Sequence, residues 1–235
     1  MVREFGFETD NGTSMSYGLR FLEYPVFVFG TENIKFIDIP GRTDPLTNRT
    51  GTYSNTIIKN KLEFVSQEKI ENCMHALQVE SWLKKIKKVK YSDLELYFFK
   101  VKKAKVEIER KYGFYGVVNV EFECDPNIYL EDGKKEIAMQ GKLDLYNQYS
   151  TACPIYKIAG EGMCTLTVNG KTMKANVGQN LTIDTEKMLA YRQDGTIMNT
   201  SVTGDYEDLY LKSGNNTISI SPNFSLKITP NWRCL

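Results

Sequence analysis

The feature that most constrains this chain is the distribution of its aromatic and β-branched residues. They recur in short alternating segments between turn residues, and the chain holds 14 Tyr, 12 Phe and 2 Trp. Rings and β-branched side chains suit a pleated surface, and alternation with a period of two is typical of a strand with one buried face. With 235 residues, of which 41% are hydrophobic, the chain can bury one large core or two smaller ones. The sequence therefore predicts a mainly β protein.

The first half shows this pattern in several places. Residues 24–29 form an apolar segment that predicts a strand, and Pro25 confines that strand to an edge or to a start position. Residues 38–53 are dense in Pro, Gly, Thr and Asn, which predicts a long loop. Alternating residues at 58–64 and 97–109 predict further strands.

One segment, residues 66–88, has helical periodicity, with Ser66 as the expected N-cap. It has two apolar faces, and a helix cannot bury both against one sheet. We expect one face to pack into the domain and the other to contact a neighbouring subunit; a helix break near residue 80 would explain the pattern equally well. The inward face is expected to be Ile70, Cys73, Met74 and Leu77. The subunit-interface face is expected to be Val79, Trp82 and Ile86.

The second half predicts a separate β domain. Residues 131–154 are poor in aliphatic residues, so we place the boundary here and expect domains at 1–130 and 131–235. Short strands then follow at intervals of roughly 8–12 residues without a helix, which indicates a sandwich or jelly roll. Asn169-Gly170 is a hairpin-turn signal between two of them.

No group of residues predicts catalysis, a cofactor or a metal. The single histidine, His75, lies in the middle of the expected helix, so a structural role is expected rather than a catalytic one. Gly160-Glu161-Gly162 lacks the third glycine of a dinucleotide motif, and the acidic group at 205–208 lacks the EF-hand pattern. The five cysteines have no paired spacing and are expected to be reduced thiols. We expect no catalytic residues, no cofactor and no metal site.

Charge and hydropathy exclude other classes. The net charge is +1, which argues against a global nucleic-acid footprint, although residues 84–111 hold eleven basic and four acidic residues. That segment is either a solvated face or a docking surface for an acidic partner or a passing polyanion. No stretch approaches the roughly 18 apolar residues of a membrane span, and Met1–Phe5 has no apolar signal region. We therefore expect no membrane partner and synthesis inside a cell.

The order of these segments resembles the distal tail protein (Dit) family of tailed phages that infect Gram-positive bacteria. The resemblance extends over nearly the whole chain. In the first half it rests on Phe5-Gly6-Phe7, Ser16-Tyr17-Gly18-Leu19, Ile39-Pro40-Gly41-Arg42, Thr50-Gly51-Thr52-Tyr53, Ser81-Trp82-Leu83 and the strand end Val120–Pro126. In the second half it rests on Cys153-Pro154-Ile155, Gly160-Glu161-Gly162, Leu166–Gly170, Leu181–Asp184, Tyr191, Leu209–Gly214 with Asn215, and Ile228-Thr229-Pro230.

What the resemblance implies is a non-enzymatic virion protein at the tail tip. It implies an N-terminal β-sandwich-like domain with one helix, which builds a homohexameric ring around a DNA-conducting channel, and a C-terminal galectin-like β-sandwich. The implied partners are the major tail tube protein, the tail-associated hub or lysin protein, and receptor-binding or baseplate proteins. DNA would only pass through the channel.

Alternative functions remain open at this level. The same part could belong to a phage-tail-like bacteriocin. The second domain could instead be a carbohydrate-binding module for host cell-wall polysaccharide, with Tyr191, Tyr206 or Tyr210 stacking on sugars. A hydrolase would depend on carboxylates that no spacing singles out.

Overall fold

The computed structural model describes residues 5–67, 69–111 and 113–235, and of residues 69 and 70 it describes only the backbone. The chain is mainly β, with one α-helix among the described residues, and divides into two compact units, Met1–Ile128 and Tyr129–Leu235. Each unit has its own hydrophobic core. The division lies two residues before the boundary expected from composition. None of the described helices is long and apolar enough to cross a membrane.

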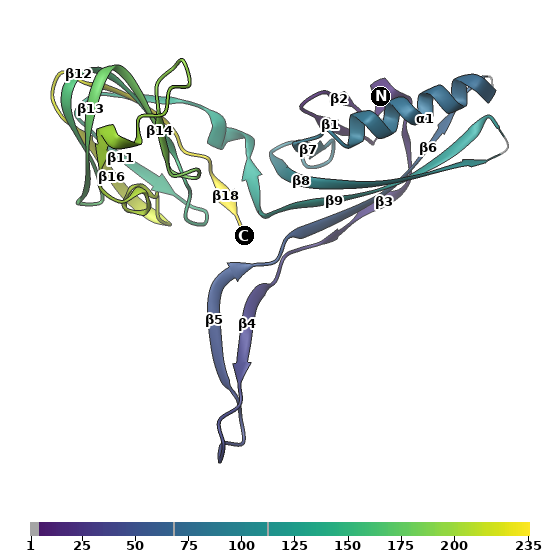
Figure 1. Cartoon of the computed structure of the whole chain (residues 1–235), viewed down its shortest axis with the longest axis horizontal. Helices are drawn as coiled ribbons and strands as arrows, with labels where there is room; N and C mark the ends of the chain where they lie inside the picture. Colours follow the sequence, from purple (N-terminus) through teal and green to yellow (C-terminus); the bar gives the residue numbers. More distant parts are fainter. Residues whose placement is uncertain (1–4, 68, 112) are drawn as a thin grey trace. The chain divides into compact units, whose positions relative to one another are not determined.

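The first unit is built on one sheet and one helix (Figure 1). The strands follow the order β2-β1-β7-β8-β9-β6-β3 across the sheet. Their bounds are β1 Phe7–Thr9, β2 Gly12–Thr13, β3 Arg20–Val28, β6 Thr56–Val65, β7 Lys88–Tyr91, β8 Tyr97–Lys111 and β9 Tyr115–Leu130. A short 3-10 helix covers Met15–Tyr17, and α1 covers Lys69–Leu83.

Alternation along the strands separates the two faces of this sheet. On β6, Ile58 and Leu62 are fully buried, while Lys59 and Lys61 between them are exposed. The neighbouring strand β9 keeps the same register, so its even-numbered residues join the same core. One face of the sheet is therefore apolar and covered, and the other is polar.

The helix covers the apolar face, but through a different stripe from the expected one. Ala76, Val79 and Leu83 are buried, with exposed fractions of 8%, 0% and 0%, and Trp82 is 5% exposed. Asn72, one turn before Ala76, is also buried. These positions recur at helical spacing and face β8.

The expected assignment of the helix faces is therefore wrong. Val79, Trp82 and Ile86, proposed as a subunit contact, lie in the core of the first unit, whereas Met74 and Leu77 are 56% and 57% exposed. The stripe that faces inward begins with an asparagine and an alanine, which are less apolar than Met74 and Leu77. The sequence pattern therefore favoured the stripe that the structure leaves exposed. Ile86 lies beyond Leu83, where the helix ends. The side chain of Ile70 lies outside the described residues.

The segment at 38–53 is also different from expectation. Its first half, residues 38–45, is a loop, but its second half forms β5 (Leu46–Tyr53), which pairs with β4 (Glu32–Ile37). Residues 32–53 thus make a two-stranded hairpin, the hairpin arm. Figure 1 shows this arm extending from the end of β3 and β6. Composition suggested a loop because Thr, Asn and Gly dominate β5, but cross-strand pairing with β4 holds it extended. β3 itself is an edge strand, which is the first of the two positions that Pro25 predicted.

The second unit is a β-sandwich. Its main sheet has the order β10-β17-β12-β13-β14, while β11 pairs with β16, which in turn pairs with the end of β12. The strands are β10 Ile137–Met139, β11 Lys142–Asn147, β12 Ile155–Val168, β13 Lys171–Asp184, β14 Leu189–Tyr191, β15 Val202–Thr203, β16 Gly214–Ile220, β17 Ser225–Thr229 and β18 Arg233–Cys234. Three 3-10 helices cover Glu131–Lys134, Asn199–Ser201 and Tyr206–Leu209.

Two local sequence signals shape β12. Asn169 and Gly170 have φ angles of 51° and 81° and join β12 to β13, which confirms the expected hairpin turn. Gly160 and Gly162 have φ angles of 149° and 97°, in the region that favours glycine. They lie between the part of β12 that pairs with β17 and the part that pairs with β16. The glycine pair therefore bends the strand between two partners and is not a phosphate loop.

Candidate functional site

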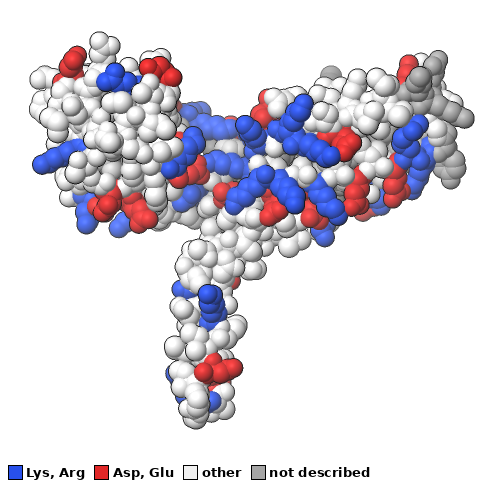
Figure 2. All heavy atoms as spheres, in the orientation of Figure 1, with Lys and Arg blue, Asp and Glu red and all other residues white. Residues whose placement is uncertain are grey.

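The outer face of the first unit's sheet carries an ordered array of charges, here called the charged sheet face. It is formed where every second residue of four neighbouring strands points away from the core. Figure 2 shows acidic and basic side chains interleaved along these strands. The face comprises Arg20 and Glu23 of β3, Lys59, Lys61 and Glu63 of β6, Lys103, Lys105, Glu107, Glu109 and Lys111 of β8, and Asn119, Glu121 and Glu123 of β9.

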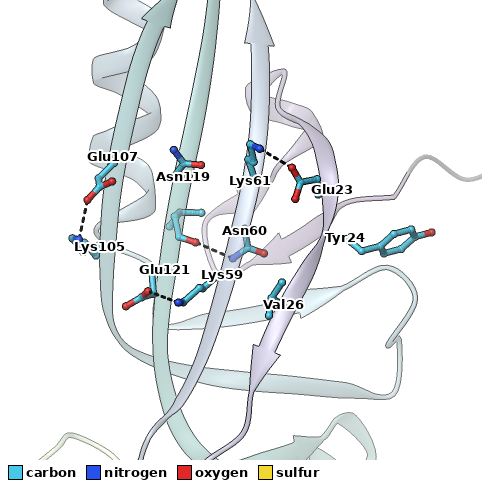
Figure 3. Close-up of a pocket in the computed structure, with 11 residues that line it drawn as sticks. Glu23, Tyr24, Val26, Lys59, Asn60, Lys61, Lys105, Glu107, Asn119 and Glu121 are labelled. Atoms are coloured by element: carbon cyan, nitrogen blue, oxygen red, sulfur yellow. Dashed lines mark hydrogen bonds and ion pairs between the residues drawn. The ribbon is translucent and has the colours of Figure 1, made fainter.

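Neighbouring charges on this face are paired within and between strands (Figure 3). The ammonium group of Lys61 lies 2.6 Å from a carboxylate oxygen of Glu23, and that of Lys105 lies 2.8 Å from Glu107. A hydrogen bond to Glu23 and its charge raise the pKa of Lys61. A hydrogen bond from Lys105 and its charge lower the pKa of Glu107. Exposed pairs of this kind stabilise a fold little, so their main effect is on the surface potential.

The charged sheet face is electrically balanced. Its members are six basic and six acidic residues. Of the eleven basic residues at 84–111, only Lys103, Lys105 and Lys111 belong to this face, and with Glu107 and Glu109 they leave a charge of +1. The other three strands offset it, because their four glutamates exceed their three basic residues by one. Sequence order could not show this compensation, because the strands that carry the acidic residues are neighbours only in the folded sheet.

A second surface is apolar and lies on the hairpin arm. Five large apolar residues of the arm are between 37% and 67% exposed. They include Phe36 and Ile37, which are consecutive and so point to opposite sides of β4. Neither side of the arm is therefore covered by the described part of the chain. The five residues are Ile34, Phe36, Ile37, Ile39 and Leu46.

Two strands of the first unit's sheet, β3 and the second half of β8, have an edge that no described strand covers. β3 ends the sheet and carries Tyr24, Val26 and Val28 with exposed fractions of 74%, 57% and 51%. On the other side of the sheet, β7 pairs with β8 only at residues 99 and 100. The backbone N–H of Val101 also donates a hydrogen bond to the carbonyl oxygen of Lys87. Beyond residue 101, no described strand pairs with that side of β8. Open strand edges present backbone groups that can pair with another chain.

The residues singled out in the sequence do not form a catalytic or metal site. His75 Nε2 lies 2.6 Å from the carbonyl oxygen of Tyr17, and its ring lies 4.9 Å from that of Phe64, which agrees with a structural role. All five cysteines are free thiols. Within the described residues, no group of three or more His, Cys, Asp or Glu side chains could hold a metal ion.

The three tyrosines proposed to stack on sugars lie in different surroundings. Tyr206 is half-buried against the core of the second unit, and its hydroxyl donates to Asn199 over 3.3 Å. Burial raises the pKa of Tyr210 to about 12, together with its contact with Cys153. Tyr191 lines a hollow on the outer face of the main sheet.

Comparison with known proteins identifies the class of fold. No protein-family model matches the chain, and no curated protein sequence matches it. Solved structures do match, and one of them, a protein of a phage adsorption apparatus, is similar in fold over nearly the whole chain.

This similar structure is that of the SPP1 Dit protein (gp 19.1), described as a paradigm of the hub adsorption apparatus in phages that infect Gram-positive bacteria. The TM-score is 0.69 over 99% of this chain and 100% of that chain, with 12% sequence identity. A chain of the phage P2 baseplate in its activated conformation also aligns, over 100% and 99% of the two chains, with 11% identity and a TM-score of 0.49. The similarity to SPP1 Dit confirms the expected, mainly β fold.

Proposed function

We propose that this chain is a structural protein of a phage tail tip, where it forms a hexameric ring that joins the tail tube to the tail-associated hub and the host-attachment apparatus. The full-length fold similarity to SPP1 Dit supports this role. So does the resemblance of the sequence segments to that family. The proposed location is the virion tail tip, and the proposed role is assembly rather than catalysis.

The observation that carries the proposal is the exposed apolar hairpin arm. A soluble monomer rarely exposes contiguous apolar surface, and such surface marks sites of association. The arm presents apolar side chains on both of its sides, and the edge strand β3 continues the pattern with Tyr24 and Val26. A second copy of the chain can cover these groups, and repeating the same contact around an axis closes a ring.

The open edges of the sheet support the same assembly. Pairing of β3 in one copy with the uncovered part of β8 in the next would extend the sheet from subunit to subunit. In such a ring the charged sheet face of every copy would point to the same side. With six basic and six acidic residues, this face would offer passing DNA no net attraction to its phosphates. It is therefore suited to line a channel.

The helix contributes to assembly in a different way from the one first expected. Val79, Trp82 and Ile86 are already covered by the core of the first unit. The exposed stripe with Met74 and Leu77 is the part of α1 that can contact a neighbouring protein, either a second copy or the tail tube protein. The second unit, which we propose is a galectin-like sandwich, would carry contacts with the hub, baseplate or receptor-binding proteins.

Light scattering and negative-stain microscopy test the proposal. The purified chain, at rising concentration, is expected to reach a mass near six times 26.9 kDa and to show rings. A monomer of 26.9 kDa at every concentration, which also fails to co-purify with a tail hub protein, would contradict it.

The same part in a phage-tail-like bacteriocin would behave identically in both measurements. Capsid and terminase genes near its gene would assign it to a phage.

A further inference from the structure

The second unit has a polar hollow on the outer face of its main sheet. Four strands meet there in one row, because Lys227 of β17 and Thr182 of β13 both lie opposite Lys157 of β12. Thr182 lies in turn opposite Tyr191 of β14. Residues directly opposite each other in an antiparallel sheet point to the same face, so the four side chains stand side by side.

The hollow is deep because the next row of residues on the same face has a short side chain at its centre. Its central residue is Ala159 of β12, which lies opposite both Ser225 and Asn180. Because alanine is short and lies next to a row that contains long side chains, it leaves a depression that a larger residue would fill. The hollow has a volume of about 570 Å³, within the roughly 300–1,000 Å³ typical of small-molecule sites.

The rim carries fixed charges. Lys157 donates a hydrogen bond to Glu136 over 2.5 Å, and Lys227 lies 3.6 Å from the other oxygen of that carboxylate. The hydrogen bond from Lys157 lowers the pKa of Glu136, so the carboxylate is ionised at neutral pH. Two ammonium groups and one carboxylate leave a single positive charge. They offer charge-assisted donors and an acceptor at defined positions.

The opposite rim carries amides and an aromatic ring. Asn180 accepts a hydrogen bond from the backbone N–H of Gln193 over 2.8 Å, which fixes its orientation. The Nδ2 group of Asn180 and the side-chain amide of Gln193 have no hydrogen-bond partner among the described residues, and both line the hollow. Tyr191 is half-buried beside them.

We propose that this hollow binds a saccharide, either neutral or carrying one acidic group. A pyranose ring has an apolar C–H face, which Tyr191 can cover, and hydroxyl groups at its edge, which the amides and the charged groups of Lys157 and Glu136 can bind. A purely apolar ligand would leave these polar groups desolvated without partners, which is costly. A polyphosphate would meet a net charge of only one. The inference is independent of ring formation.

The test is saccharide binding by the full chain in calorimetric titrations. The probes are oligosaccharides of glucose, galactose and N-acetylglucosamine, and the corresponding oligosaccharides that contain uronic acids. At least one probe is expected to bind, with affinity reduced at least tenfold by Ala159→Phe, which fills the hollow, and by Tyr191→Ala. Tyr146→Ala is the matched control, because Tyr146 is 67% exposed but lies on β11, away from the hollow; it should bind as the unmodified chain does.

Two outcomes would overturn the proposal. One is that no probe of either set binds at millimolar concentration. The other is that a probe binds equally well to the Ala159→Phe and Tyr191→Ala variants while circular dichroism shows them folded. Comparison of the neutral and acidic probes shows whether the single positive charge contributes to binding. Neither negative result affects the proposed assembly role, which is measured by mass and microscopy.

Discussion

The hydroxyl of Tyr91 donates a hydrogen bond to Oδ1 of Asn60 over 2.6 Å in the core of the first unit. Tyr91 is fully buried and Asn60 is 3% exposed. The Nδ2 group of the same amide lies 3.4 Å and 3.3 Å from the carbonyl oxygens of Ile58 and Val120. This contact joins β7 to β6 across the core, and removal of one partner would leave a buried polar atom unsatisfied.

Tyr91→Phe is therefore expected to lower the free energy of unfolding by about 1–3 kcal/mol, since Asn60 Oδ1 loses its donor. Urea unfolding followed by fluorescence measures the change. Tyr115→Phe is the matched control: it removes a hydroxyl that bonds Glu63 near the surface, and should cost no more than about 0.5 kcal/mol. Equal unfolding midpoints for the two variants would show that the buried bond contributes nothing beyond the surface one.

The chain is expected to lose stability at alkaline pH. Burial raises the pKa of Tyr91 well above its ordinary value and that of the Cys124 thiol to about 12. Both groups are neutral when protonated, and the unfolded chain ionises them at about pH 10 and pH 8.5. The folded state therefore keeps protons that the unfolded state releases. The contribution of these two groups to the free energy of unfolding is complete below about pH 8 and declines as pH rises toward 12.

Urea unfolding at pH 7, 9 and 10.5 measures this effect. The Cys124→Ala variant serves as the control, because it should reduce the loss of stability that begins near the thiol's unfolded-state pKa. A free energy of unfolding that stays constant up to pH 10.5 in the unmodified chain would contradict the prediction.

Two leucines of α1 test which face of the helix is buried. Leu83→Ala is expected to destabilise the fold by about 2–5 kcal/mol, because Leu83 is fully buried and its removal leaves a cavity. Leu77→Ala removes the same atoms from a side chain that is 57% exposed, and should change stability by no more than about 0.5 kcal/mol. Thermal unfolding by circular dichroism compares them. A larger loss in Leu77→Ala would restore the helix orientation first expected from the sequence.

The hairpin arm is expected to carry self-association. Phe36→Asp places a charge on an apolar side chain that is 67% exposed, so it should weaken assembly while leaving monomer stability nearly unchanged. Sedimentation velocity measures the shift toward the monomer. Asn48→Asp adds the same charge opposite Lys35 without removing an apolar group, and should assemble normally. The prediction fails if both variants keep the full assembly.

The balanced charge of the charged sheet face predicts that the chain does not retain duplex DNA at physiological salt. Replacement of Glu107 and Glu121 by Lys would change the net charge of this face from zero to +4, and should produce binding that weakens as salt is raised. Fluorescence anisotropy with a labelled duplex measures both proteins. Tight, salt-dependent binding by the unmodified chain would show that the face attracts phosphates rather than letting DNA pass.

Local signals in the sequence predicted the class of fold well. Period-two alternation predicted the strands at 58–64 and 97–109, Pro25 predicted an edge or a start position for its strand, and Asn169-Gly170 predicted a hairpin turn. Each of these depends on contacts between residues close in sequence or on the backbone preference of one residue, so no knowledge of the neighbouring elements was needed.

The features that bear on function depended on contacts between distant segments. Which stripe of α1 faces inward was decided by the shape of the core, which accepts Asn72 and Ala76 and leaves Leu77 outside. The arm at 32–53 became a hairpin through pairing of β4 with β5. The compensation of charge on the sheet and the row from Lys227 to Tyr191 both come from strand register. Register joins residues far apart in the chain, and such a long-range choice is made only when the whole sheet forms.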